Sequence, residues 1–168
     1  MLQVGCDVCQ ITTLDQMLSE EPNAVERIFN PEERQYAQSQ AQPAQHLAAV
    51  YAAKEALGKA VREPDVLGKY YREVTVCHQE NGAPLLRLSD RLAEALSSRG
   101  ITVTDLSISH DGDYAVATVL VERKPLHCDR CQRSLANLVE ERVADVLIPV
   151  VNQEGISGYR CPVCLRGW

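Results

Sequence analysis

The sequence lacks a long hydrophobic run, since no apolar stretch approaches the ~20 residues that a helix needs to cross a bilayer. It also lacks a basic region ahead of an apolar stretch at its N-terminus, Met1-Leu2-Gln3-Val4-Gly5, so we expect no secretory signal. These absences predict a cytoplasmic location and no membrane partner. The length of 168 residues is enough for one compact domain and a small appendage.

Positive charge is scarce as well. The 17 Lys and Arg residues face 23 Asp and Glu residues, which gives a formal net charge of −6. Nucleic-acid binding needs a basic face that contacts phosphates, so this balance disfavours a nucleic-acid partner. The proportions of hydrophobic and charged residues, 45% and 24%, are ordinary for a globular protein.

Hydrophobic periodicity and turn residues predict an α+β fold. Asn30 and Glu33 flank Pro31 in the pattern of a capped helix start, and Asn81-Gly82 is typical of a hairpin turn. In order, the pattern predicts a strand ending near Gly5, helical segments at 14–29 with a break near Pro22, helices at 31–38 and 44–60, hairpin strands at 73–77 and 85–88, a helix at 89–99, and strands at 103–108 and 114–121.

Two acidic residues stand out among these elements. Asp7 follows the first predicted strand, and Glu55 lies on the helix of small apolar residues, next to Lys54 and one turn before Lys59. Mg²⁺ is usually held by one or two carboxylates together with substrate phosphates, so Asp7 and Glu55 could share this cation. The alternative is an ordinary i,i+4 ion pair between Glu55 and Lys59, with Asp7 as a turn residue. From spacing alone the ion pair is the commoner case.

A series of short motifs changes that weighting. The motifs are Gly5-Cys6-Asp7-Val8, Arg27-Ile28-Phe29 with Glu33 and Tyr36, Lys54-Glu55-Ala56-Leu57-Gly58-Lys59-Ala60, Gly82-x-Pro84, Ser107-Ile108-Ser109-His110-Asp111 and Tyr114-Ala115-Val116-Ala117. In this order they resemble the motifs of the holo-[acyl-carrier-protein] synthases. The resemblance covers about residues 1–123, and the ordered series is more specific than any one motif.

This resemblance implies a phosphopantetheinyl transferase fold, an antiparallel sheet packed with a long central helix. It implies transfer of the phosphopantetheine arm of coenzyme A to a serine of an acyl carrier protein, with release of adenosine 3′,5′-bisphosphate. It also implies a homotrimer with active sites between subunits, in which a neighbouring subunit supplies the segment 107–110. The implied catalytic residues are Asp7, Glu55 and Lys59, with Mg²⁺ bound by Asp7 and Glu55, and the implied coenzyme A contacts are Lys54, Lys59, Ser109 and His110.

Three positions differ from the family pattern. Val50 stands where an arginine is common, the segment 61–65 has no glycine where the family has a Gly-Thr-Gly loop, and the segment 11–16 carries no arginine for an acidic carrier. These differences leave open an alternative function: a catalytically weak homologue that binds a carrier or another partner through its C-terminal module.

That C-terminal module begins near Lys124 and is not part of the family pattern. Two Cys-x-x-Cys pairs, Cys128 with Cys131 and Cys161 with Cys164, predict a structural Zn²⁺ site of four thiolates. The alternatives are reduced pairs or disulfides, which are rarer in the cytoplasm. We expect His127 to be a bystander. The apolar stretch 143–151 should supply a ribbon strand whose edge Trp168 covers, and the acidic balance disfavours a zinc-ribbon nucleic-acid binder.

The other cysteines and histidines have plainer interpretations. Cys6 and Cys9 also form a Cys-x-x-Cys pair, but buried free cysteines are the commoner case at such a strand. We expect Cys77 to pack within its strand, and His46 and His78 to lie on the surface.

Overall fold

The computed structural model describes residues 1–63, 70–134, 138, 147–152 and 155–166. By its internal contacts the chain divides into two compact units, which are described separately below. The first comprises Met1–Ser97 and Ile101–Glu122, and the second comprises Ser98–Gly100 and Arg123–Trp168. No helix in the described part of the chain is long and apolar enough to span a membrane.

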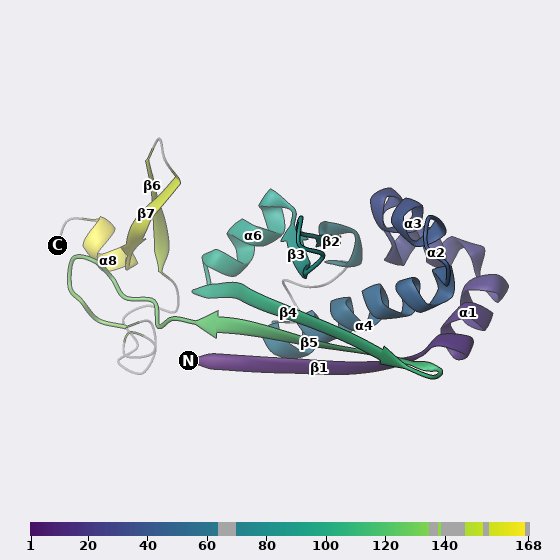
Figure 1. Cartoon of the computed structure of the whole chain (residues 1–168). Helices are drawn as coiled ribbons and strands as arrows, with labels where there is room; N and C mark the ends of the chain where they lie inside the picture. The colour runs from purple at the N-terminus through teal and green to yellow at the C-terminus, as the bar shows by residue number, and fades with distance from the viewer. Residues whose placement is uncertain (64–69, 135–137, 139–146, 153–154, 167–168) are drawn as a thin grey trace. The chain divides into compact units, whose positions relative to one another are not determined.

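The first unit is an α+β structure, which confirms the predicted fold class (Figure 1). Its three-stranded sheet has the order β1-β5-β4, and β2 and β3 form a separate antiparallel hairpin. The elements are β1 (Leu2–Gln10), α1 (Ile11–Glu20), α2 (Pro22–Ile28), α3 (Pro31–Gln38), α4 (Pro43–Val61), the 3₁₀ helix η1 (Tyr70–Glu73), β2 (Val74–His78), β3 (Pro84–Leu88), α6 (Asp90–Ser97), β4 (Ile101–Asp111) and β5 (Tyr114–Arg123).

Helix α4 is the central helix of this unit, and its small side chains let β1 lie directly against it (Figure 1). The contact is close at Gly5: a Cβ atom there would lie 2.0 Å from the backbone oxygen of Ala56 and 2.5 Å from the backbone nitrogen of Ala60. No side chain larger than hydrogen fits this crossing. Since side chains alternate along a strand, the crossing also directs Asp7, two residues later, toward α4.

Strand β1 is longer than predicted. Its antiparallel register with β5 runs from Leu2 opposite Glu122 to Gln10 opposite Tyr114, so the strand does not end near Gly5. The alternation along β1 leaves Cys6 exposed and Cys9 buried. The expectation that both cysteines are buried is therefore wrong for Cys6, which lies on the face opposite α4.

The predicted helix starts are present. The side chains and backbones of Asn30 and Glu33 form the expected capping box at α3. Ser89 Oγ accepts a hydrogen bond from the backbone N–H of Leu92 at 3.2 Å and so begins α6. Sequence-local features of this kind were sufficient to place both helices.

The second unit contains the antiparallel hairpin of β6 (Ile148–Asn152) and β7 (Gly155–Arg160), followed by α8 (Pro162–Leu165). Its small core includes Leu138 and Leu147. The predicted ribbon strand at 143–151 is a strand from residue 148 onward, while 143–146 and Trp168 lie outside the described residues.

Candidate active site and metal centre

Asp7 and Lys59 form an ion pair between β1 and α4. Asp7 Oδ1 lies 2.6 Å from Lys59 Nζ, and the two side chains are 14% and 54% exposed. The hydrogen bond to Asp7 is the main cause that raises the pKa of Lys59. Lys59 therefore pairs across two elements with Asp7, in place of the i,i+4 ion pair with Glu55 that spacing alone favoured.

Glu55 lies one helical turn before Lys59 and is half-buried. Burial raises the pKa of Glu55, the negative charge of Asp7 raises it further, and Lys59 acts in the opposite direction. Two carboxylates that repel each other in a partly desolvated site would bind a divalent cation favourably, because the cation relieves both costs. The oxygen donors of Asp7 and Glu55 thus fit Mg²⁺, with room in its coordination for phosphate oxygens.

Three tyrosines surround the Glu55 side of this site. The Tyr71 hydroxyl donates a hydrogen bond to Glu55 Oε1. The Tyr71 ring stacks on Tyr70, with ring centroids 4.7 Å apart, and on Tyr51 at 6.2 Å. None of these three tyrosines is predicted as a site residue by the sequence motifs. Tyr51 could have been predicted to lie near Glu55, because it stands four residues earlier on the same helix face. Nothing in the sequence indicated that Tyr71 donates to Glu55.

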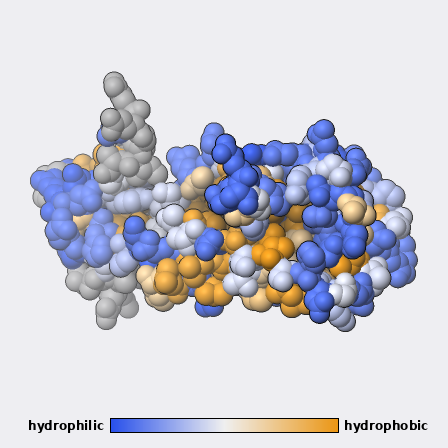
Figure 2. Space-filling model, in the orientation of Figure 1, coloured by the Kyte–Doolittle hydropathy of each residue, from blue (hydrophilic) through white to orange (hydrophobic). Residues whose placement is uncertain are grey.

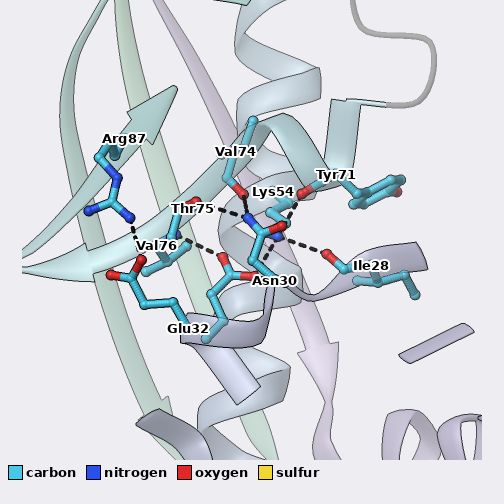
Figure 3. Close-up of polar contacts among 10 residues, drawn as sticks. Ile28, Asn30, Glu32, Lys54, Tyr71, Val74, Thr75, Val76 and Arg87 are labelled. Atoms are coloured by element: carbon cyan, nitrogen blue, oxygen red, sulfur yellow. Dashed lines mark hydrogen bonds and ion pairs between the residues drawn. The ribbon is translucent and has the colours of Figure 1, made fainter. Parts of the chain in front are cut away.

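Lys54 differs from its expected role as a coenzyme A contact. Its side chain is fully buried, and Nζ donates hydrogen bonds of 2.7 Å each to Glu33 Oε2 and to the backbone oxygens of Ile28 and Tyr71 (Figure 3). All three donor positions of the ammonium are thereby satisfied within the core. Because one residue along a helix turns about 100°, Lys54 faces the core while its neighbour Glu55 faces the site.

Glu33 is the charged partner of Lys54 and is itself buried. Its Oε1 accepts from the backbone N–H of Val76 at 2.8 Å, and its Oε2 accepts from the backbone N–H of Asn30 at 2.8 Å. The Asn30 side chain in turn donates to Val74 O and Thr75 Oγ1 (Figure 3). Burial lowers the pKa of Lys54, and Glu33 opposes that shift. This network ties α3, α4 and β2 to the backbone of Tyr71.

Ser109 and His110 lie exposed near the end of β4. Within the described residues of this chain, no hydrogen bond or ion pair joins either of them to Asp7, Glu55 or Lys59. The described residues of a single chain thus bring Asp7, Glu55 and Lys59 together, without a hydrogen bond or ion pair from Ser109 or His110 to these three.

The surface histidines are not isolated. His78 stacks on the Tyr36 ring at 4.5 Å, and His46 meets the same ring edge-on at 5.7 Å. Burial lowers the pKa of His46, and the neighbouring His110 and His78 lower it further.

In the second unit, the four cysteines form a cluster. The Sγ atoms of Cys128, Cys131, Cys161 and Cys164 all lie within 4.8 Å of one another. Thiolates around a tetrahedral Zn²⁺ at Zn–S distances of about 2.3 Å would be about 3.8 Å apart, so the cluster fits this ion. His127 is exposed and is not part of the cluster.

Three hydrogen bonds made by Asp129 and Arg130 hold these cysteine loops in place. Asp129 Oδ2 accepts from the backbone N–H of Tyr159 at 2.8 Å, and the backbone N–H of Asp129 donates to Tyr159 O at 2.9 Å. Arg130 Nη1 donates to Cys164 O at 3.0 Å. The loop of the first cysteine pair is therefore fixed against β7 and the loop of the second pair.

Comparison with known proteins places the first unit among characterised relatives. Residues 3–119 match the family model of the 4'-phosphopantetheinyl transferase superfamily. The holo-[acyl-carrier-protein] synthase of Trichlorobacter lovleyi is 37% identical over 123 residues, which is 73% of this chain and 98% of the relative. The enzyme of the same name from Geobacter sulfurreducens is 36% identical over 120 residues, 71% of this chain and 95% of the relative.

Solved structures of holo-[acyl-carrier-protein] synthases are also similar to this chain. An ACPS–CoA complex from Chronobacterium ammoniagenes is 33% identical with a TM-score of 0.62, covering 74% of this chain and 98% of that chain. A holo-(acyl-carrier-protein) synthase from Bacillus anthracis in complex with CoA is 28% identical with a TM-score of 0.57, covering 73% of this chain and 96% of that chain.

Proposed function

This chain belongs to the 4'-phosphopantetheinyl transferase superfamily and is a holo-[acyl-carrier-protein] synthase, and we propose that Asp7, Glu55 and Lys59 form its active site. At this site phosphopantetheine passes from coenzyme A to a serine of an acyl carrier protein. One observation carries this assignment: the carboxylates of Asp7 and Glu55 and the ammonium of Lys59 lie close enough to interact between β1 and α4. All three residues fall within 3–119, the range that matches the family model.

In this reaction the serine Oγ attacks the phosphorus that bears pantetheine, the phosphoanhydride bond breaks, and adenosine 3′,5′-bisphosphate leaves while the serine loses its proton. Bound by Asp7 and Glu55 together with the pyrophosphate, Mg²⁺ would act as a Lewis acid that stabilises the leaving group. Lys59 adds a fixed positive charge, because Asp7 holds its pKa above the ordinary value. Its exposed side chain is accessible to phosphates.

The reaction is tested by incubating the protein with a fluorescent coenzyme A analogue and apo carrier proteins from the same genome, with Mg²⁺ or with a chelator. We expect label on the carrier only in the presence of Mg²⁺. Labelling that persists unchanged with the chelator would contradict the metal dependence, and no labelling under either condition would favour the catalytically weak, partner-binding alternative.

We further propose a homotrimer, assembled through the face of the sheet opposite α4. Leu2, Val4 and Val8 of β1 are 64%, 53% and 59% exposed, and Tyr114 at the start of β5 is 50% exposed. Figure 2 shows hydrophobic residues gathered over the region where Figure 1 draws these strands. An exposed apolar patch on one face supports an interface. In such a trimer Ser109 and His110 would reach the nucleotide of a neighbouring subunit.

The trimer makes a prediction for sedimentation. We expect the wild-type protein to sediment as a trimer at micromolar concentration and Val4→Lys to sediment as a monomer, because a charge at a buried apolar interface loses its hydration. Gln79→Lys, in the exposed turn before β3, is the matched control and should leave the trimer intact. A wild-type monomer would count against this assembly.

For the second unit we propose a zinc-ribbon-like module at residues 124–168, appended to a transferase domain at 1–123. The convergent cysteines support a structural Zn²⁺ bound by Cys128, Cys131, Cys161 and Cys164. Four thiolates fill a tetrahedral site, so this metal would have no open position for water or substrate. We also propose a cytoplasmic location, because cysteine pairs that converge on one metal site are more typical of reducing compartments than of secreted proteins.

Zinc removal should unfold this module alone. We expect about one equivalent of zinc per chain, and a strong chelator should abolish amide-exchange protection in β6 and β7, because so small a core depends on its metal. Protection in β1 and α4 should remain as the internal control. Less than about half an equivalent in protein purified without chelator would argue against the site.

A further inference from the structure

The Glu55 carboxylate has one hydrogen-bond donor among the described residues, the hydroxyl of Tyr71. The bond goes to Oε1, and no donor to the second oxygen of the carboxylate is found within residues 1–63 and 70–134. Tyr71 lies in η1, directly before β2, and makes no described hydrogen bond or ion pair with Asp7 or Lys59. Among the described residues, the Tyr71 hydroxyl therefore interacts with Glu55 and with neither of the other two site residues.

The Tyr71 side chain is held from several directions. Its ring lies nearly parallel to that of Tyr70, at an interplanar angle of 17°, and to that of Tyr51, at 5°. Its backbone oxygen accepts the 2.7 Å hydrogen bond from the buried Lys54. The hydroxyl thus has a fixed position relative to α4.

We propose that Tyr71 is a positioning residue for the metal site: its hydroxyl fixes one oxygen of Glu55 and leaves the other oriented for the cation shared with Asp7. This inference rests on the proposed function. Groups that hydrogen-bond a metal-ligating carboxylate orient it before the metal arrives, and their loss typically costs 10–100-fold in metal affinity or activity. Without the hydroxyl, the Glu55 side chain would have to lose rotational freedom when the cation binds.

The test is Tyr71→Phe, which keeps the stacked ring and removes the hydroxyl alone. We expect the Mg²⁺ concentration for half-maximal transfer to rise about tenfold, with kcat at saturating Mg²⁺ and the KM for coenzyme A changed by less than about twofold. The affinity of the enzyme–coenzyme A complex for Mn²⁺, measured by electron paramagnetic resonance, should fall by the same factor. This second readout does not depend on turnover.

Two matched controls separate positioning from packing. Tyr51→Phe retains the other stacked ring, and its hydroxyl makes no hydrogen bond in the described part of the chain, so both metal readouts should be unchanged. The Tyr70 hydroxyl donates a buried 2.7 Å hydrogen bond to the Lys54 backbone oxygen. Tyr70→Phe removes this bond but keeps the ring that stacks on Tyr71, so it should lower the unfolding midpoint and leave the Mg²⁺ dependence at the wild-type value.

The outcomes are distinguishable from a failure of the proposed function. An unchanged Mn²⁺ affinity in a folded Tyr71→Phe variant would overturn the inference, as would an equal loss of affinity in Tyr70→Phe. A wild-type enzyme that transfers nothing would instead contradict the proposed function, and the Mn²⁺ comparison would still decide the role of Tyr71.

Discussion

Replacement of Glu55 by glutamine is expected to lower the rate of phosphopantetheine transfer by about a thousandfold, on the order of 4 kcal/mol in activation free energy. Glutamine keeps the size of the side chain and an oxygen that can accept from Tyr71, but it removes the charge that would hold the cation. Asp7→Asn should have an effect of the same order, because the two carboxylates are proposed to share one ion. The measurement is single-turnover transfer to an apo carrier.

Stability provides the control for this loss of activity. Burial and Asp7 both raise the pKa of Glu55, which means that its charged form is disfavoured in the folded protein. Glu55→Gln should therefore not lower the midpoint of chemical unfolding. Glu32→Gln, which removes a carboxylate from an exposed pair with Arg87, should retain wild-type transfer. Transfer by Glu55→Gln above about a tenth of the wild-type rate would contradict a role in metal binding.

Lys54→Met is expected to destabilise the folded protein by about 3–5 kcal/mol, the cost of leaving a buried charge without its partner. The substitution would leave the Glu33 carboxylate in the core with only its two backbone donors, and the backbone oxygens of Ile28 and Tyr71 without the ammonium. The measurement is the midpoint and slope of denaturant unfolding at one protein concentration.

The matched control lies on the same helix. Lys59→Met removes the ammonium of a side chain that is 54% exposed and should change stability by less than about 1 kcal/mol. A Glu33→Leu change added to Lys54→Met should recover part of the lost stability, because it removes the uncompensated carboxylate. A Lys54→Met variant as stable as Lys59→Met would show that the buried network contributes little.

Sequence-local features predicted much of the fold. The capping box at Asn30 and Glu33 and the long run of helix-forming residues in α4 specify their elements through neighbours a few residues away. The extent of β1 could not be predicted in this way, because it depends on pairing with β5, more than a hundred residues later. Without knowledge of that pairing, the residues after Gly5 have no sequence pattern that marks them as part of the strand.

In the candidate site, too, the residues of a sequence motif could be predicted and the contacts set by tertiary structure could not. Asp7, Glu55 and Lys59 were identified through a motif, and the crossing at Gly5 brings Asp7 to Lys59. The role of Lys54 could not be predicted, because its burial depends on carbonyl groups from two distant segments, at Ile28 and Tyr71. The same applies to the hydroxyl of Tyr71, whose partner is set by tertiary structure alone.

The most direct test of the central claim is the intact mass of an apo carrier protein after incubation with this enzyme, natural coenzyme A and Mg²⁺. The proposed active site predicts a gain of one phosphopantetheine group on the carrier serine, with an equal amount of adenosine 3′,5′-bisphosphate released by the wild-type enzyme. Glu55→Gln should form both products about a thousandfold more slowly. A carrier that stays unmodified by folded wild-type enzyme, when every apo carrier of the same genome is offered, would contradict the claim.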